Sequence, residues 1–329
     1  MSRCPRCRRA AGWEACTSPQ IGWSNAVARA PFADYDRRKG RFSAMNRKLG
    51  LALGGGGARG LAHLGALIAL EDAGIPITAI AGTSMGAAMG ATKAIEADLK
   101  KIRTLLGCLD LKEMLDVSDS TARELRKIIG RSVVEYVRGS TWREEDARPH
   151  DLARLRELFS LLTARKRFED TTIPFAVVAA DLETGEPIVL RDGTLADAVT
   201  ASTAVPGVFS PVARDGRLLI DGGIVEKLPI DTVITLGADA VLAIDTGAPL
   251  AREVGTCLDA LLQTQRATSH HLTRIQMERS RDRLGGRLVL LRPNVGWIRM
   301  FGFEHTEAAI EAGEAETRAH LDEIRALLS

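Results

Sequence analysis

Ser84 lies in the stretch Gly82-Thr83-Ser84-Met85-Gly86, directly after an apolar run. Gly-x-Ser-x-Gly between a strand and a helix is the nucleophile elbow, a tight turn that presents a serine hydroxyl for attack on a carbonyl carbon. Glycines at these two places permit a sharp turn and a close approach of other backbone. Because the pattern is common by itself, a catalytic role requires a base and an oxyanion hole elsewhere in the chain.

A second glycine segment, GGGARG at residues 55–60, follows an earlier apolar run and precedes a helical pattern. It matches the Gly-x-Gly-x-x-Gly fingerprint of dinucleotide-binding folds, which also needs an acid at the end of the next strand. No acid lies between Asp72 and Glu96, and Leu61 stands where a phosphate loop requires lysine. Nucleotide binding is therefore disfavoured. Consecutive glycine N–H groups at a helix start are instead suited to hold a developing negative charge.

The base for such a serine is the next requirement, and the chain offers six histidines. His63 falls on an apolar helical stripe and is expected to be a packed core residue. The others that could follow a serine in α/β-hydrolase order lie in polar or terminal helical segments and are expected at the surface: His270, His271, His305 and His320.

Asp221 is the better candidate base, because it directly follows a short apolar strand and precedes two glycines in LLIDGG. An exposed aspartate has a pKa near 3.9 and is a weak base, but burial beside a nucleophile would raise that pKa. An Asx turn that only shapes the loop is the alternative explanation for an aspartate at this place.

The elements that must position these residues begin at Leu49, where short apolar runs start to alternate with helical patterns. This alternation predicts stacked βαβ units around a mainly parallel sheet. Strands are expected at Leu49–Leu53, Ile77–Ala81, Phe175–Ala179, Ile188–Leu190, Arg217–Ile220, Ala240–Ile244 and Arg287–Leu291, with a last amphipathic helix from about Glu304. Because the loops after neighbouring parallel strands open at one sheet edge, the glycine segment and Ser84 should meet there as oxyanion hole and nucleophile.

Residues 99–168 break this alternation, since they are charged and helical. Their apolar stripes are Leu99, Ile102, Leu105 and Leu109, followed by Leu155, Leu158, Leu161 and Leu162. We expect a helical cap inserted beside the sheet, although ordinary surface helices would show the same stripes over most of this length.

In the order GGGGARG, GTSMG and DGG, these motifs resemble the patatin-like phospholipases, serine lipid acyl hydrolases with a Ser–Asp dyad and no catalytic histidine. The stretches RFEDTTIPFAVVAADLETGEPIVLRDG and AVTASTAVPGVFSPV also resemble that family, so the similarity covers about residues 49–246. The resemblance implies that Ser84 is the nucleophile and Asp221 the proton acceptor. It also implies an oxyanion hole formed by Gly55, Gly56 and Gly57, with Arg59 beside them. Gly82 and Gly86 would form the nucleophile elbow. Gly222 and Gly223 would complete the Asp-Gly-Gly motif. Asp181 occupies a recurrent family position and is expected to be structural.

The composition is that of a globular protein, with 45% hydrophobic and 26% charged residues in a 329-residue chain. Residues 1–44 carry nine Lys or Arg against three acids, a net charge of +6. Because the whole chain has a net charge of +2, the remainder carries −4. By charge, the main body is therefore not a nucleic-acid binder. We expect residues 1–44 to be a basic leader without regular structure, or an extension upstream of a start at Met45, and residues 45–329 to be the hydrolase domain.

The leader holds Cys4, Cys7 and Cys16, which do not complete the four ligands of a structural zinc site. It has no apolar core of a secretory signal, and the chain has no run of 18 apolar residues that could span a membrane. No metal or organic cofactor is implied. The protein is expected in the cytoplasm, with peripheral contact to a membrane.

Taken with the resemblance, the residues predict a three-layer α/β/α sandwich with a helical cap. The expected function is that of a phospholipase, lysophospholipase or carboxylesterase that acts on a lipid or lysophospholipid through an acyl-enzyme. Two alternatives stay open. One is an acyltransferase on the same fold, which would pair the serine with a histidine, and the other is a regulatory adaptor that retains the pocket.

Overall fold

The computed structural model describes residues 35–36, 41–42, 47–109, 111, 149–206, 208–250 and 257–329. The chain divides into two units, Met1–Ala44 and Met45–Ser329. The described part of the first unit is an antiparallel strand pair, β1 (Tyr35–Asp36) and β2 (Arg41–Phe42). The three leader cysteines lie outside the described residues, and the assignment of residues 1–44 as a leader stays a prediction.

The second unit is built on an eight-stranded sheet of order β10-β9-β3-β4-β5-β8-β7, with β6 also paired to β5. The strands are β3 (Leu49–Leu53), β4 (Ala79–Thr83), β5 (Phe175–Asp181), β6 (Pro187–Leu190), β7 (Val212–Arg214), β8 (Arg217–Asp221), β9 (Ala240–Ile244) and β10 (Leu288–Leu291). The pairs from β10 to β5 are parallel, whereas β6, β7 and β8 pair antiparallel. The predicted mainly parallel sheet is confirmed, with an antiparallel portion beyond β5.

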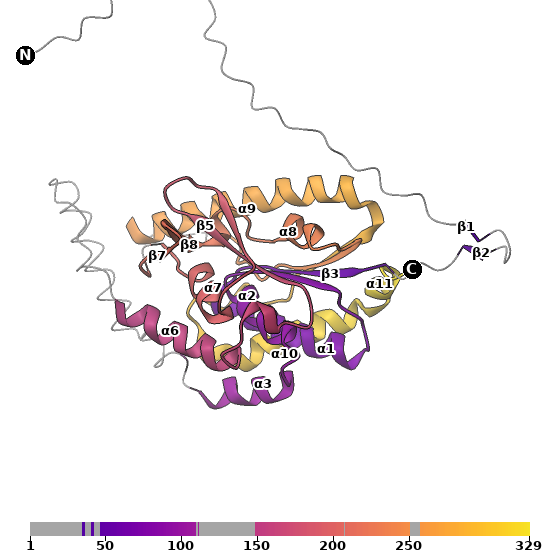
Figure 1. Ribbon diagram of the computed structural model, residues 1–329, viewed down its shortest axis with the longest axis horizontal. Coiled ribbons are helices and arrows are strands. Elements are labelled where there is room, and N and C mark those ends of the chain that lie inside the picture. The colour runs from indigo at the N-terminus through magenta and orange to yellow at the C-terminus, as the bar shows by residue number, and fades with distance from the viewer. Residues whose placement is uncertain are drawn as a thin grey trace, which may run out of the picture. The chain divides into compact units, whose positions relative to one another are not determined.

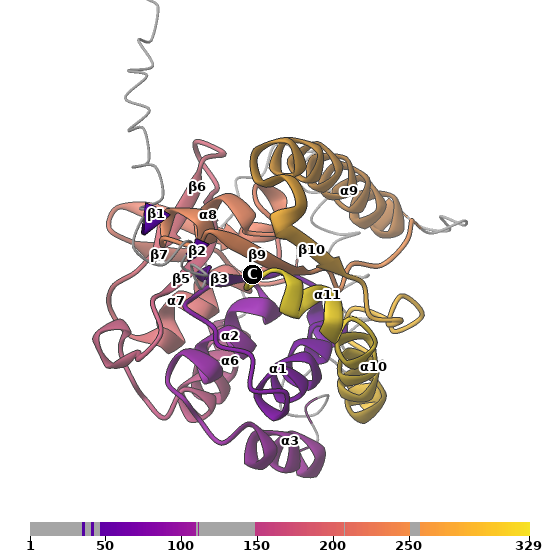
Figure 2. The same ribbon diagram turned by 90° about the vertical axis from the view of Figure 1, so that its right-hand side faces the viewer.

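Helices cover both faces of this sheet (Figure 1, Figure 2). They are α1 (Ala62–Asp72), α2 (Met85–Ala94), α3 (Leu99–Cys108), α6 (Pro149–Leu162), α7 (Leu195–Ser202), α8 (Ile230–Thr235), α9 (Cys257–Leu284), α10 (Thr306–Ala319) and α11 (Leu321–Ala326). In both views α8 and α9 lie on one face, and α1, α2, α7 and α10 lie on the other, with α3 and α6 outside them. The three-layer α/β/α arrangement predicted from the sequence is therefore confirmed.

The period of two along the strands explains why both faces are covered. In β3, Leu51 and Leu53 belong to the larger apolar cluster under α1 and α2, whereas Ala52 between them belongs to a second cluster with residues of α8 and α9. Strand β9 repeats this alternation, with Leu242 in the first cluster and Val241 in the second. A sheet that is apolar on both faces must bury both.

Strand β4 begins and ends two residues later than the sequence predicted. Pro76 has no N–H to donate, and Thr78 uses its N–H and its hydroxyl on the carbonyl of Leu49 before regular pairing begins at Ala79. As a result the strand runs to Thr83, immediately before Ser84. Strand β5 likewise extends beyond its predicted end, to Asp181, where β8 pairs with it.

The predicted cap is described only at its two ends, by α3 and α6, and residues 110 and 112–148 lie outside the described residues. The apolar stripe of α3 was predicted to include Leu105, but the structure places the neighbouring Leu106 in it. Leu105 is 41% exposed, and Leu106 is the buried residue, 2% exposed. A helix of 3.6 residues per turn allows either neighbour to continue a stripe, and packing against the domain selects Leu106.

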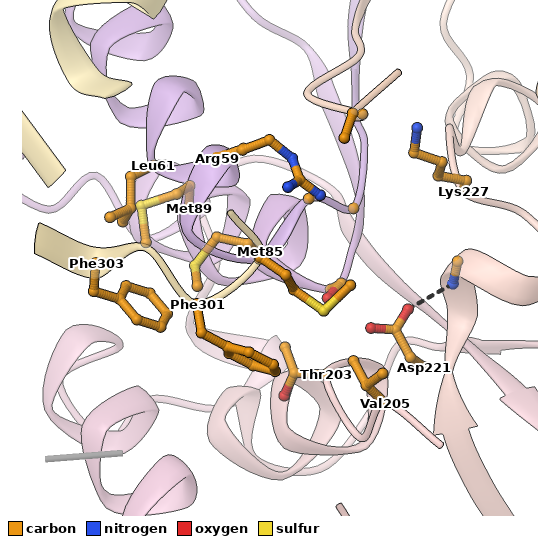
Figure 3. A pocket seen from close by; sticks show the side chains of 18 of the residues that line it. Arg59, Leu61, Met85, Met89, Thr203, Val205, Asp221, Lys227, Phe301 and Phe303 are labelled. Carbon is orange, nitrogen blue, oxygen red and sulfur yellow. Dashed lines mark hydrogen bonds between the residues drawn. The ribbon is translucent and has the colours of Figure 1, made fainter. Parts of the chain in front are cut away.

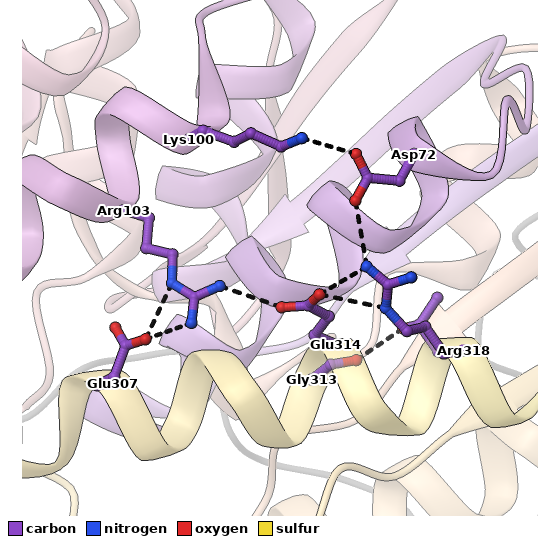
Figure 4. A network of polar contacts seen from close by, with 8 residues as sticks. Asp72, Lys100, Arg103, Glu307, Gly313, Glu314 and Arg318 are labelled. Carbon is purple, nitrogen blue, oxygen red and sulfur yellow. Dashed lines mark hydrogen bonds and ion pairs between the residues drawn. The ribbon is translucent and has the colours of Figure 1, made fainter.

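Ion pairs attach α3 to the helices beside it (Figure 4). Arg103 pairs with Glu307 and Glu314 of α10, at 3.1 Å for the second pair. Lys100 pairs with Asp72 of α1 at 2.9 Å, and Asp72 in turn binds Arg318 of α10 at 3.2 Å. These contacts hold the helix that carries Leu106 on the rest of the domain.

Candidate active site

Ser84 occupies a strained turn between β4 and α2. Its backbone has φ 54° and ψ −126°, a positive φ that a non-glycine residue adopts at a cost of about 1–3 kcal/mol. The carbonyl of Ser84 accepts the N–H groups of Ala87 and Ala88, at 2.9 and 3.2 Å, so the turn passes directly into the helix. The sharp elbow expected from the Gly-x-Ser-x-Gly pattern is present.

The two flanking glycines are required by space. A Cβ at Gly82 would lie 2.4 Å from Cα of Ala87, and one at Gly86 would lie 2.2 Å from the carbonyl oxygen of Leu53. Both contacts involve backbone, which cannot move aside as a flexible side chain can. The start of α2 is therefore pressed against β3 and β4, and this contact sets the position of Ser84.

Asp221 reaches Ser84 from an antiparallel strand. In β5, Val178 is paired with Thr83 of β4, and the next residue, Ala179, is paired with Asp221 of β8. Because Val178 and Ala179 are successive residues of one central strand, Ser84, which follows Thr83, and Asp221 lie close to each other at the same end of the sheet. The Asp221 carboxylate accepts the N–H of Gly223 at 2.7 Å, which makes it the cap of the short helical turn that follows.

The surroundings of Asp221 make it a stronger base than an ordinary aspartate. Its pKa is raised from 3.8 to about 6, chiefly because burial disfavours the charged form. Hydrogen bonds from Gly223 and from the Ser84 hydroxyl oppose this rise. Asp221 and Ser84 are each only 6% exposed, so bulk water is largely excluded from the pair.

The glycine segment contributes fewer free donors than predicted. The N–H of Gly55 donates to the Lys227 carbonyl at 3.1 Å, so this donor is already used. The N–H groups of Gly56 and Gly57 have no acceptor among the described residues. Gly55 instead permits close approach, since a Cβ there would stand 3.3 Å from Cβ of Ser84. The N–H groups of Gly56 and Gly57, with the first N–H groups of α2, are therefore the ones left free to hold a negative charge beside Ser84.

Arg59 supports the glycine segment from behind. Its Nε donates to the Thr246 carbonyl at 3.1 Å and its guanidinium donates to the Ile298 carbonyl at 2.9 Å. These contacts tie the segment to the loops that follow β9 and β10. Burial, then the like charge of Arg266, lowers the pKa of Arg59 to about 10 against the attraction of Asp245.

No histidine among the described residues hydrogen-bonds with Ser84 or Asp221. His63 is fully buried, as expected, with Nε2 2.7 Å from the Gly54 carbonyl, and burial lowers its pKa to about 4. His271 contacts Arg274, His305 packs on Trp297 and His320 contacts the Glu316 carbonyl. His270 is exposed but contributes to the pocket wall.

The pocket that contains Ser84 and Asp221 is mainly apolar (Figure 3). Figure 3 shows Leu61, Met89, Phe301 and Phe303 on one side and Asp221 on the opposite side. Leu106 of α3 and four residues of α6, Leu155, Leu158, Phe159 and Leu162, also line it. The cap helices therefore form part of the wall, and the pocket suits a molecule with an apolar chain and one reactive polar group.

Ser202 is a part of the site that sequence reasoning missed. Its hydroxyl accepts the N–H of Ser84 at 2.7 Å and donates to the Val178 carbonyl at 2.6 Å. Only its place in AVTASTAVPGVFSPV could have suggested it, since serine is common. Asp181 has the structural role expected of it, because it pairs with Arg217 at 2.7 Å and accepts the N–H of Glu183. Gly222 touches β5, where an added Cβ would lie 2.2 Å from the Val178 carbonyl oxygen.

Comparison with known proteins identifies the family. The family model described as patatin-like phospholipase matches residues 51–234, more than half of the chain. The chain belongs to the patatin-like phospholipase family. The match spans both the Ser84 elbow and the Asp-Gly-Gly motif.

Three curated proteins illustrate how this family member relates to others. Human patatin-like phospholipase domain-containing protein 6 is 32% identical over 241 residues, which cover 69% of this chain and 16% of that protein. Lysophospholipase nte1 of Aspergillus fumigatus is 31% identical over 229 residues, 67% of this chain and 13% of its own. An uncharacterized NTE family protein of Mycobacterium tuberculosis is 34% identical over 221 residues, 65% of this chain and 52% of its own. The chain thus spans about half or less of the length of these relatives.

Proposed function

We propose that this patatin-like protein is a serine lipid acyl hydrolase, a carboxylic ester hydrolase that acts through a Ser84–Asp221 dyad. The observation that carries the proposal is that Ser84 and the buried Asp221 carboxylate line the same apolar pocket, where the Ser84 hydroxyl acts to lower the pKa of Asp221 against the effect of burial. The occurrence of a lysophospholipase among the relatives supports a lipid or lysophospholipid as the substrate.

In the first half of the proposed reaction, the Ser84 oxygen attacks the acyl carbonyl carbon and its proton passes to Asp221. The negative charge that develops on the carbonyl oxygen is held by the N–H groups of Gly56 and Gly57, aided by the N-terminus of α2. When the ester C–O bond breaks, the alcohol takes the proton from Asp221 and the acyl group remains on Ser84.

In the second half, Asp221 accepts a proton from water as the water oxygen attacks the acyl-enzyme. The proton then returns to Ser84 as the fatty acid leaves. The carboxylate acts as a base in both halves, and its raised pKa suits it to both accepting and returning the proton near neutral pH.

The test is Ser84→Ala, measured by fatty-acid release from a lysophospholipid, hydrolysis of a short aryl ester and labelling by a fluorophosphonate. All three should be lost while the fold is retained. A folded Ser84→Ala protein with wild-type turnover would refute the nucleophile. A wild-type protein that hydrolyses no ester would favour the adaptor alternative.

An acyltransferase with a Ser–His pair is a second candidate function, because His270 lines the same pocket as Ser84. We expect His270→Ala to retain substantial activity, and likewise alanine at His63, His271, His305 and His320. If a folded His270→Ala variant lost as much turnover as Asp221→Asn, the dyad would be wrong and the transferase would replace it.

We also propose peripheral contact with a lipid surface in the cytoplasm. In the described parts of the chain, no helix has the length and apolar character of a transmembrane span. Trp297 is 58% exposed, and Leu250 is also exposed. Their two loops lie side by side, since a Cβ added at Gly296 would be 2.9 Å from Pro249. Both loops also line the pocket, through residues 247–248 and 300–301.

Flotation with phosphatidylcholine vesicles tests this contact. Trp297→Ser should reduce the bound fraction several-fold, whereas Leu182→Ser, at an exposed leucine outside the pocket wall, should not. Equal binding by wild type and Trp297→Ser would refute the proposed surface.

A further inference from the structure

Three cationic side chains among the described residues line the pocket, and they differ in what they bind: Arg59, Lys227 and Arg266. The guanidinium of Arg59 is used on two backbone carbonyls. The ammonium of Lys227 pairs with Asp245 at 2.9 Å. Arg266, on α9, is different, because its Nε is buried and has no hydrogen-bond partner among the described residues.

A buried guanidinium N–H without an acceptor is costly, and the cost is greater beside another cation. Arg266 lies near enough to Arg59 for the two like charges to contribute to the lowered pKa of Arg59. Among the described residues, the two carboxylates near this wall are already used, since Asp245 binds Lys227 and Asp221 accepts the N–H of Gly223. An anionic group on the substrate would supply Arg266 with its missing acceptor.

The chemical form of that anion follows from the rest of the pocket. The apolar wall suits an acyl chain, and Ser84 marks the place of the ester carbonyl. In a glycerophospholipid, the phosphate is only a few bonds from the ester on the alcohol side. A planar guanidinium binds phosphate oxygens with paired, charge-assisted hydrogen bonds.

We propose that Arg266 binds the phosphate of the phospholipid or lysophospholipid whose ester lies at Ser84, and so makes the enzyme prefer phosphate-bearing acyl esters over neutral ones. This inference rests on the proposed hydrolase function. It assigns a specificity-determining residue to α9, outside the three glycine-bearing motifs that carry the chemistry.

The first experiment compares kcat/KM for lysophosphatidylcholine and for a monoacylglycerol with the same acyl chain. In the wild type the phosphate-bearing ester should be preferred, and Arg266→Gln should lower this preference about 10- to 100-fold, as expected for a lost charge-assisted hydrogen bond. Arg266→Lys should retain part of the preference. Arg274→Gln is the matched control, because Arg274 lies on the same helix, outside the pocket wall, and pairs with Glu278.

An equal loss on both esters would overturn the inference, because it would mean that Arg266 only supports the fold. An unchanged preference in Arg266→Gln would also overturn it. If the wild type hydrolysed neither ester, the proposed function would fail by itself, and binding would decide the inference.

Binding is measured with Ser84→Ala protein, which should hold lysophosphatidylcholine more tightly than monoacylglycerol. The double variant Ser84→Ala, Arg266→Gln should lose that difference, and a retained difference would overturn the inference. Inorganic phosphate and glycerol phosphate are included as competitors. If Ser84→Ala protein bound glycerol phosphate in an Arg266-dependent way but did not bind lysophosphatidylcholine, Arg266 would belong to a site for a free phosphate ester. That result would overturn the lipid assignment.

Discussion

The N–H of Ser84 donates to the hydroxyl of Ser202 at 2.7 Å, and that hydroxyl donates to the Val178 carbonyl at 2.6 Å. Val178 lies beside Ala179, the residue that pairs with Asp221. A buried hydroxyl at the end of α7 thus ties the strained elbow to β5, the strand that also positions Asp221, the proposed base. Ser202 is a positioning residue, since it acts on the chemistry only through Ser84.

Ser202→Ala should lower kcat about tenfold or more with little change in KM, because the elbow N–H loses its buried acceptor and the nucleophile loses its alignment. The measurement is steady-state kinetics on an aryl ester with thermal unfolding of the same protein. Thr200→Ala is the control, since its buried hydroxyl bonds only to the Ala196 carbonyl in the same helix. If both variants lose activity in proportion to stability alone, Ser202 has no positioning role.

Activity should depend on pH through Asp221. Its pKa is raised to about 6, so below about pH 6 the carboxyl is increasingly protonated and cannot accept the Ser84 proton. kcat/KM should therefore rise with pH up to about 6 and then level off. Asp221→Asn should lose about 10²–10⁴-fold in turnover and lose this acidic limb. A limb that survived in Asp221→Asn would assign the ionisation to another group.

The same pKa predicts that Asp221 reduces stability when it ionises. The folded-state pKa is above the ordinary 3.8, so the unfolded chain releases the proton first and folding becomes less favourable as pH rises from about 4 to about 6. Asp221→Asn should therefore gain stability relative to the wild type across this window and keep the gain at pH 7.5. Chemical denaturation at pH 4 and pH 7.5 checks this, and a gap between the proteins that does not widen with pH would contradict it.

Leu106 should contribute to acyl-chain binding, and Leu105 should not. Leu106 lines the pocket, whereas Leu105 is exposed outside it. Leu106→Ala removes apolar contact equivalent to a few methylene groups, so the preference for an aryl decanoate over an aryl acetate should fall about tenfold. Leu105→Ala, next to it on the same helix, should keep the preference. Equal losses on both esters would show that Leu106 serves only the core.

Gly86 and Gly107 should respond in opposite ways to alanine. At Gly86 a Cβ would lie 2.2 Å from the Leu53 carbonyl oxygen, so overpacking should destabilise the fold by roughly 1–3 kcal/mol or more. At Gly107, in α3, nothing lies within 4 Å of the added atom, and alanine should stabilise the fold by about 0.5–1 kcal/mol. Thermal melts of both variants give the answer, and a stable, fully active Gly86→Ala would refute the tight elbow.

Local sequence patterns were sufficient to predict the features that depend on neighbouring residues in the chain. The turn at Ser84 follows from the two glycines around it, and the apolar periods of the strands predict their existence and the two covered faces of the sheet. The packed state of His63 could also be predicted, because it falls on an apolar helical stripe. The chemistry proposed for Ser84, the glycine segment and Asp221 rests on residue types and spacing, which can be recognised without a fold.

The relations between distant segments were decided by the tertiary structure. Asp221 lies at the level of Ser84 because β5 continues to Asp181 and β8 returns along it antiparallel, a register that no local pattern contains. The engagement of the Gly55 N–H by Lys227, the hydroxyl of Ser202 under the elbow and the choice of Leu106 over Leu105 have the same origin. Each depends on a contact between residues far apart in the chain, and the raised pKa of Asp221 exists only once packing has removed the carboxylate from water.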